Sequence, residues 1–392
     1  MTTNVVIVAA RRTAMGSFQG QFASLSASDL GAAAIAAVVA DAGVDGAQIE
    51  DAHIGCVLPA GQGQAPGRQA VLKAGLSLGV PVTTINKMCG SAMKATMYAF
   101  DQIRSGDVKV ALAGGMESMS NAPYILPKVR QGLRMGDGGG WRDMLGVGLE
   151  AGRTCLVMGA LDARWGDKQG FSRQAKDAVA MESVRRAQRA TNDGESATEI
   201  VPVTVKTKTG DVSYDKDEQP LSAKIDKIPT LKPAFKADGT VTAANSSSIS
   251  DGAAAMVLMA EDEAARRGLK PLARVLGHAT HAQDPAWFTT APVGAIELLL
   301  RKLGWTPDKP DLYEVNEAFA VVPMTVMQEL RIPHEKMNVL GGACALGHPV
   351  GASGARIVVT LLNALRLRGG KYGVAAICLA GGEATALAVE LL

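Results

Sequence analysis

The chain has 392 residues, of which 47% are hydrophobic and 20% charged, a composition typical of a globular protein with more than one core. A formal net charge of +2 gives no sign of a nucleic-acid partner, and no stretch approaches the ~20 apolar residues of a membrane span. The N-terminal run has no signal-peptide pattern, so we expect a cytoplasmic protein. The chain has five cysteines, and no two of them have CxxC spacing: Cys56, Cys89, Cys155, Cys344 and Cys378. The sequence therefore indicates neither a disulfide framework nor a metal site.

A repeated order of elements is expected along the chain, which indicates an α/β fold. Residues 29–43 read as a helix, with Ser28 as N-cap and Gly43 at its end, and a strand follows at 51–54. The same order recurs later in the chain, where residues 293–303 read as a helix that stops at Gly304, and a strand follows at 312–315. At a slightly larger separation in sequence, residues 5–13 resemble residues 272–280, and residues 111–115 resemble residues 378–382.

We therefore predict two similar α/β halves. The first spans residues 1–118 and is completed by 249–267, where a strand is expected at 251–259, and the second spans 268–392. Residues 119–248 differ in character, with the glycine run 138–140 and an expected charged helix over 172–190. This segment is predicted to be an inserted loop domain.

The first candidate for chemistry is Cys89, which follows an extended run at 82–85 and opens a helix that reaches about Arg104. A helix N-terminus stabilises negative charge, so this position favours a thiolate. The alternative is a buried structural cysteine at a crowded turn.

Three further segments carry polar candidates. Residues 338–354 place His348 in a glycine-rich loop before a helix that starts at about Ser353, where an imidazole is suited to accept a thiol proton. Cys378 lies at the end of a strand. Asn316 lies in a strand-to-helix passage, either to orient a water or carbonyl, or to cap a helix that begins near Glu317.

In this order and spacing, the four segments resemble those of the thiolases, the acetyl-CoA acetyltransferases and 3-ketoacyl-CoA thiolases. The resemblance covers essentially the whole chain and includes residues 12–14, 115–120, 231–235 and 239–245. It implies an α/β thiolase fold in which each half holds a mixed five-stranded sheet. It also implies reversible condensation of acetyl-CoA with an acyl-CoA, or thiolysis of a 3-ketoacyl-CoA.

The resemblance also implies roles for the candidate residues. Cys89 would accept the acyl group as a thioester, His348 would take its proton, and Cys378 would be the acid/base at the α-carbon. His348 and a water held by Asn316 would bind the enolate oxygen. The backbone N–H groups of Cys89 and Ala380 would bind the tetrahedral oxyanion. No metal or organic cofactor is implied, because CoA is substrate and product.

Binding of CoA is assigned by the resemblance to Ser247, Ala318 and Phe319, with Phe235 and Ala243 nearby. Ser247 would bond the pantetheine, whereas a solvated turn is the alternative for this serine run, and core packing is the alternative for either phenylalanine. The family pairs through its sheet-bearing halves, so we expect a homodimer, or a homotetramer through the inserted domain. No nucleic-acid or membrane partner is expected.

Departures from the family pattern leave two alternatives open. Ala380 replaces a usual glycine, which restricts the backbone if φ is positive there, and residues 156–159 replace the usual His-Met-Gly step. A non-catalytic relative that binds CoA thioesters would tolerate such changes. Another condensing enzyme of the same fold, such as a ketoacyl synthase, would not need Cys378.

Overall fold

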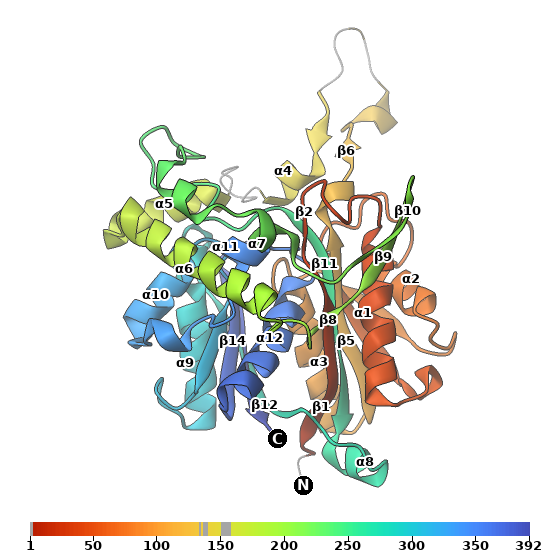
Figure 1. Ribbon diagram of the computed structural model, residues 1–392. Coiled ribbons are helices and arrows are strands. Elements are labelled where there is room, and N and C mark those ends of the chain that lie inside the picture. The colour runs from red at the N-terminus through yellow and green to blue at the C-terminus, as the bar shows by residue number, and fades with distance from the viewer. Residues whose placement is uncertain (1–2, 133–134, 136–139, 150–157) are drawn as a thin grey trace.

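The computed structural model describes residues 3–132, 135, 140–149 and 158–392 (Figure 1). The first half alternates strands with helices and ends on a strand that returns after the insertion. Its elements are β1 (Val5–Thr13), β2 (Gly16–Ser17), α1 (Ala27–Ala42), β3 (Asp51–Gly55), α2 (Pro66–Lys73), β4 (Val82–Ile85), α3 (Ser91–Ser105), β5 (Val110–Ser118), β11 (Ser250–Ala260) and α8 (Glu261–Arg266).

The second half repeats this order. Its elements are β12 (Ala273–Ala282), α9 (Ala291–Leu303), β13 (Leu312–Val315), α10 (Val321–Leu330), α11 (Ala343–Leu346), α12 (Ser353–Arg368), β14 (Tyr372–Leu379) and β15 (Glu383–Leu391). β11 pairs antiparallel with β1 and β5, and β15 pairs antiparallel with β12 and β14. β3 is parallel to β5, and β13 is parallel to β14. The α/β class and the two similar halves are confirmed.

All these strands join in one sheet of order β13-β14-β15-β12-β1-β11-β5-β3-β4. The halves meet where residues 5–7 of β1 pair antiparallel with residues 273–275 of β12. The first half supplies the five expected strands. The described residues of the second half supply only β12, β13, β14 and β15. In place of the fifth strand, which in the first half is β4 paired with β3, the second half has a single parallel bridge between Tyr313 and Met337.

One of the sequence matches behind the repeat is wrong. In the sheet, Asp51 pairs with Ala111, and in the second half Leu312 pairs with Gly373, so Ala111 corresponds to Gly373 and not to Cys378. The match of residues 5–13 is shifted by one residue, because the bulge after Ile7 corresponds to the bulge after Val275. Short Ala- and Gly-rich strands look alike in several registers, which explains both errors.

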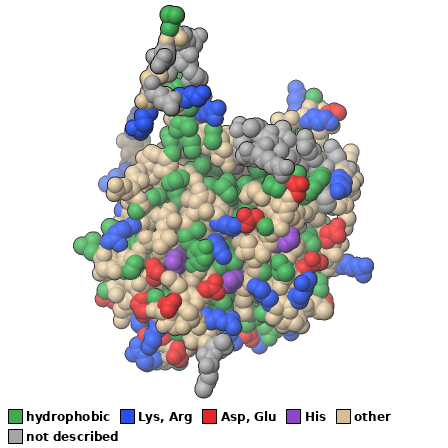
Figure 2. Space-filling view, turned by 180° about the vertical axis from the view of Figure 1, so that it is seen from behind, with side chains coloured by type: hydrophobic (Ala, Val, Ile, Leu, Met, Phe, Trp, Pro, Cys, Tyr) green, Lys and Arg blue, Asp and Glu red, His purple; other side chains and the backbone are tan. Residues whose placement is uncertain are grey.

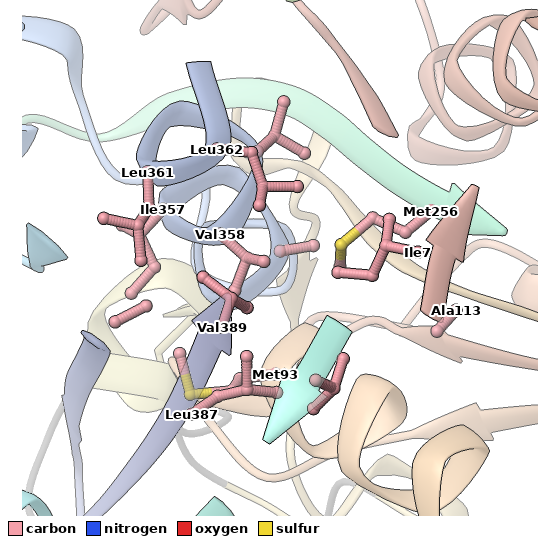
Figure 3. Packing of buried hydrophobic residues seen from close by; sticks show 14 of the residues in the cluster. Ile7, Met93, Ala113, Met256, Ile357, Val358, Leu361, Leu362, Leu387 and Val389 are labelled. Carbon is pink, nitrogen blue, oxygen red and sulfur yellow. The ribbon is translucent and has the colours of Figure 1, made fainter. Parts of the chain in front are cut away.

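Helices form three layers on the two faces of the sheet. Figure 1 shows α1 and α2 on one outer side, α9 and α10 on the other, and α3 with α12 between the halves. Strand residues alternate between these layers: Ile7 and Met256 face the central cluster, while Val6 and Val257 face α1. Figure 3 shows side chains of α12, among them Val358 and Leu361, packed in this central cluster.

The insertion between β5 and β11 lies over one end of the sheet and projects as an arm at β6 (Figure 1). Its strand β8 extends the first half by pairing parallel with the end of β1, Arg12 beside Ile200. Its elements are β6 (Tyr124–Ile125), β7 (Arg142–Asp143), α4 (Met144–Leu149), α5 (Met158–Gln169), α6 (Arg173–Asn192), β8 (Ile200–Val201), β9 (Val203–Thr207), β10 (Gly210–Tyr214) and α7 (Glu218–Ser222).

Helix boundaries follow the capping signals closely. Gly43 and Gly304 end α1 and α9 in the left-handed conformation, as expected. Ser172 caps α6. The predicted cap of α1 is wrong, because Ser26 and not Ser28 accepts the N–H of Asp29, whose side chain completes a capping box.

The two halves also touch where the loop that carries His348 reaches the first half. A Cβ added to Gly115 of β5 would overlap the carbonyl oxygen of Gly351, and one added to Gly55 of β3 would lie 2.7 Å from the same oxygen. Glycine is therefore required on both strands for this approach. Across residues 3–132, 135, 140–149 and 158–392, no helix is long and apolar enough to cross a membrane.

Gly115→Ala should lower the free energy of unfolding by about 1–3 kcal/mol, the usual cost of forcing a methyl group into a packed interior. The matched control is Gly79→Ala, whose Cβ would lie in ordinary contact, 3.5 Å from Ser77 Oγ. Thermal unfolding midpoints measure both. If Gly115→Ala had the same unfolding midpoint as Gly79→Ala and the unchanged protein, the contact between Gly115 and Gly351 would not be as tight as described.

Candidate active site

A cavity of about 450 Å³ lies between the halves, below the insertion. It brings together the predicted site residues from distant parts of the chain, with the exception of Asn316, which does not line it. The predicted residues that line it are Cys89, Phe235, Ala243, Ser247, Ala318, Phe319, His348, Cys378 and Ala380.

Cys89 lies in a sharp turn between β4 and α3. Met88 has φ 48°, a conformation rare for a residue with a side chain, and Ser91 at the start of α3 holds the turn. The Ser91 hydroxyl donates to the Met88 carbonyl at 2.6 Å and accepts the Lys87 N–H at 2.9 Å. Because Gly90 has no side chain, the Leu379 side chain can occupy the space where a Cβ of residue 90 would lie. Cys89 is thereby turned toward the end of β14.

The resting form of Cys89 is a thiol. Burial raises the pKa of Cys89 to about 11, although hydrogen bonds from the backbone N–H groups of Ala380 and Cys89 oppose this shift. The prediction that its place before a helix favours a thiolate is therefore wrong, because desolvation outweighs the helix N-terminus. A thiol in this state could act as a nucleophile only if a base took its proton.

His348 presents an imidazole to the same cavity. Its backbone N–H donates to the Ser248 carbonyl at 3.2 Å and to Ser250 Oγ at 3.3 Å, and its Nδ1 lies 2.6 Å from Ser353 Oγ. Burial, with a contribution from the charge of Arg356, lowers the pKa of His348 to about 3, so the ring is neutral. Nε2 is buried and has no hydrogen-bond partner among the described residues, Cys89 included. Catalytic hydrogen bonds often close only when substrate is bound.

Cys378 and Ala380 follow each other at the end of β14. Burial raises the pKa of Cys378 well above its usual value, and ionisation of the neighbouring Cys89 would raise it further, so this sulfur is also a thiol at rest. Ala380 is not among the described non-glycine residues with positive φ, because Gly381 and Gly382 make the turn at φ 96° and 82°. The replacement of glycine by Ala380 therefore leaves its N–H available toward Cys89.

Asn316 is not among the residues that line the cavity, and its side chain is buried. Its Oδ1 accepts a hydrogen bond from Arg356 Nη2 at 3.1 Å, which orients the amide. Its Nδ2 has no partner in the part of the chain that the structure describes. The alternative of a helix cap is wrong, because α10 begins only at Val321.

The residues predicted to bind CoA surround the wider part of the cavity. Ser247 donates its hydroxyl to the Ala318 carbonyl at 3.0 Å, which leaves its oxygen free to accept and argues against a simply solvated turn. Phe235 is 43% exposed and faces the cavity, so core packing does not explain it. Phe319 is buried against Phe288 at 6.2 Å between ring centroids, so it serves the core as well as the wall.

Sequence reasoning missed several contributors. Ser353 and Arg356 contact His348 and Asn316, and their position in the first turn of a helix after the glycine-rich loop was a usable signal. Glu117 accepts the N–H groups of Val57, Leu58 and Gly351, a role that no local pattern indicates. Cys155, residues 156–157 and residues 138–139 lie outside the described residues. Within the described ranges, no cluster of His, Cys, Asp and Glu suits a metal ion.

Comparisons with known proteins agree along the full chain. The family models described as thiolase, N-terminal domain, and thiolase, C-terminal domain, match residues 5–262 and 269–391. The acetyl-CoA acetyltransferases of Allochromatium vinosum and Pseudomonas aeruginosa are 44% and 45% identical, covering 100% and 98% of this chain and 100% and 98% of their own.

Two solved structures have the same fold. The Acat5 thiolase of Ascaris suum, in complex with coenzyme A, superposes with a TM-score of 0.94 at 40% identity, covering 99% of this chain and 100% of that chain. The Bacillus anthracis acetyl-CoA acetyltransferase superposes with a TM-score of 0.97 at 37% identity, covering 100% of this chain and 99% of that chain.

Alkylation of Cys89 by iodoacetamide should accelerate about tenfold per pH unit from pH 7 to pH 10, because a thiol with a pKa of about 11 is still far from full ionisation there. Peptide mass spectrometry at each pH measures the rate at Cys89. Glutathione, a thiol with an unperturbed pKa, is the control and should level off earlier. A plateau for Cys89 below pH 8 would contradict the resting thiol.

Proposed function

The chain belongs to the thiolase family, and from this we propose that it catalyses the reversible condensation of acetyl-CoA with an acyl-CoA, and thiolysis of 3-ketoacyl-CoA, through an acyl group on Cys89. The observation that carries the proposal is the convergence of Cys89, His348 and Cys378 on one cavity. Cys89 comes from the first half, and the other two come from the second.

In thiolysis, the Cys89 sulfur attacks the 3-keto carbon while its proton passes to His348 Nε2. The backbone N–H groups of Cys89 and Ala380 would hold the oxyanion, which is supported by their hydrogen bonds to this sulfur. Because the imidazole and the thiol are both neutral at rest, proton transfer between them becomes favourable only as the oxyanion forms and is stabilised. The acyl group then remains on Cys89 as a thioester.

When the carbon–carbon bond breaks, its electron pair passes into the enolate of acetyl-CoA. Cys378, a thiol at rest, gives its proton to the α-carbon and regains one from the CoA thiol that takes over the acyl group. The buried and unpartnered His348 Nε2 and Asn316 Nδ2 support the role of holding the enolate oxygen, the latter through a water. The thioester itself acidifies the α-carbon, so the proposed steps use no metal or organic cofactor.

CoA is proposed to enter along Ser247, Ala318 and Phe319, with Phe235 and Ala243 at the wider end. The Ser247 oxygen is free to accept an amide N–H of pantetheine, while the exposed face of Phe235 covers its apolar part. The apolar walls suit a thioester arm and not a charged substrate.

We also propose the domain division 1–118 with 249–267, 119–248 and 268–392, supported by the return of β11 between β1 and β5. A cytoplasmic homodimer or homotetramer is proposed as the working form. For a dimer, β4 provides the strand at the end of the sheet. For a tetramer, the arm provides exposed apolar side chains, visible in Figure 2. Those of the arm are Tyr124, Val129, Met135 and Trp141.

The roles of the two cysteines separate in single variants. After incubation with acetyl-CoA, Cys378→Ser should carry an acetyl group on Cys89, whereas Cys89→Ser should carry none. Both should lose thiolysis of acetoacetyl-CoA, Cys378→Ser by about 100-fold or more, the usual contribution of a positioned acid or base. Intact-protein mass spectrometry and a thiolysis assay measure these outcomes.

The control is Cys344→Ser, which changes a buried thiol outside the cavity and should stay active. Normal turnover of Cys89→Ser would overturn the proposed mechanism. Normal turnover of Cys378→Ser would overturn only the role of Cys378. An unchanged protein that neither acylates nor cleaves acetoacetyl-CoA would be a non-catalytic relative.

Assembly through the arm is tested by Tyr124→Glu combined with Trp141→Glu, which places charges on side chains that are 64% and 71% exposed. Light scattering should show the tetramer replaced by the dimer, because buried unpaired charges destabilise an interface. Leu392→Glu, a change to an exposed residue at the opposite end of the molecule, is the control. An unchanged mass in the double variant would show that the arm does not assemble the protein.

A further inference from the structure

The first residue of α12 lies against the catalytic histidine. Ser353 Oγ is 2.6 Å from His348 Nδ1 and 2.9 Å from the carbonyl oxygen of Pro349. All three groups are buried, and Ser353 does not line the cavity. The contact is therefore one between protein groups and does not involve substrate.

The direction of these two hydrogen bonds follows from the chemistry of the groups. A carbonyl oxygen accepts and cannot donate, so the single hydroxyl proton of Ser353 lies toward Pro349. With the hydroxyl proton directed at Pro349, the Ser353 oxygen is left to accept from His348, and Nδ1 carries the ring proton. In a neutral ring this leaves Nε2 without a proton.

The duplicated half contains the same arrangement with an unambiguous donor. Ser91 is the first residue of α3, as Ser353 is of α12. Its hydroxyl donates to the Met88 carbonyl, and its oxygen accepts the backbone N–H of Lys87, a group that can only donate. Ser353 repeats this polarity, with His348 Nδ1 in the place of the backbone N–H.

We propose that Ser353 is a positioning residue that holds His348 with its proton on Nδ1, so that the bare Nε2 faces Cys89 as a base. The inference rests on the role proposed for His348. The backbone of His348 is already held by Ser248 and Ser250, so the ring orientation and the proton position are what Ser353 adds.

The proton transfer needs this form of the ring. As the Cys89 sulfur forms its bond to the acyl carbon, its proton moves to the lone pair on Nε2, and the ring becomes a cation with a proton on each nitrogen. In acylation by acetyl-CoA, the departing CoA thiolate takes the Nε2 proton, and the ring returns to its resting form. With a proton on Nε2 at rest, there would be no lone pair to receive the thiol proton.

The resting proton position is measured directly by nitrogen-15 magnetic resonance of histidine-labelled protein. The chain has five histidines, so the His348 signals are assigned by their loss in His348→Asn. We expect a protonated Nδ1 and an unprotonated Nε2 in the unchanged protein. A protonated Nε2 would overturn the inference, whatever the activity of any variant.

Removal of the hydroxyl tests its effect on rate. Ser353→Ala should slow acylation of Cys89 by acetyl-CoA about 10-fold to 100-fold, as for loss of the hydrogen-bond partner of other functional histidines, with little change in KM. Ser353→Thr keeps the hydroxyl and should recover most of the rate. The matched control is Thr96→Val, which removes a buried hydroxyl that donates to the Ala92 carbonyl at 3.0 Å and should acylate normally.

The outcomes distinguish this inference from the proposed function. Normal acylation by Ser353→Ala would overturn the positioning role, as would equal losses in Ser353→Ala and in a well-folded Ser353→Thr. If Ser353→Thr unfolds, the nitrogen-15 measurement on the unchanged protein still shows which nitrogen of His348 carries the proton. Normal acylation by His348→Ala would instead overturn the proposed role of the histidine, whichever ring nitrogen carries the proton in the unchanged protein.

Discussion

The close contact between the His348 loop and strands β3 and β5 determines where the rest of the site lies. Gly55 and Gly115 leave room for the Gly351 carbonyl, and Glu117 accepts the Gly351 N–H at 3.0 Å. The same carboxylate accepts the N–H groups of the loop after β3, so one buried side chain connects the two halves. Together with the hydrogen bond from the His348 N–H to Ser250 of β11, this contact joins the His348 loop to the half that carries Cys89.

Burial sets the chemistry that this contact makes possible. It raises the pKa of both reactive thiols and lowers that of His348, so none of the three carries a charge at rest. Charge separation then becomes favourable only when a substrate carbonyl presents an oxygen to the fixed N–H groups. The hydrogen bonds of Ser353 and Arg356 gain importance for the same reason, since these buried groups orient the side chains of His348 and Asn316.

Much of this arrangement was readable from the sequence, and the failures have physical causes. Helix ends marked by glycine and the strands at 82–85 and 312–315 were predicted correctly, because local chemistry determines them. Cys89, His348 and Cys378 were singled out because glycine-rich turns mark them, and the structure brings all three to one cavity. The thiolate was wrong because desolvation depends on the whole fold. Glu117 and Arg356 were missed because a buried charge is recognised only by its partners, which lie far away in sequence.

The short pairing between β1 and β12 has a further consequence. Because the bulges align Ile7 with Val275, residues 5, 6 and 7 correspond to 273, 274 and 275, so Val6 pairs with its own counterpart Arg274. This is the isologous contact of a two-fold dimer, with a pseudo-dyad at that pair. The chain thus repeats, within one polypeptide, the contact of a two-fold dimer. A dimer of identical chains carries the same groups on both sides of its axis, whereas two joined halves can differ, as they do here with Cys89 in the first and His348 and Cys378 in the second.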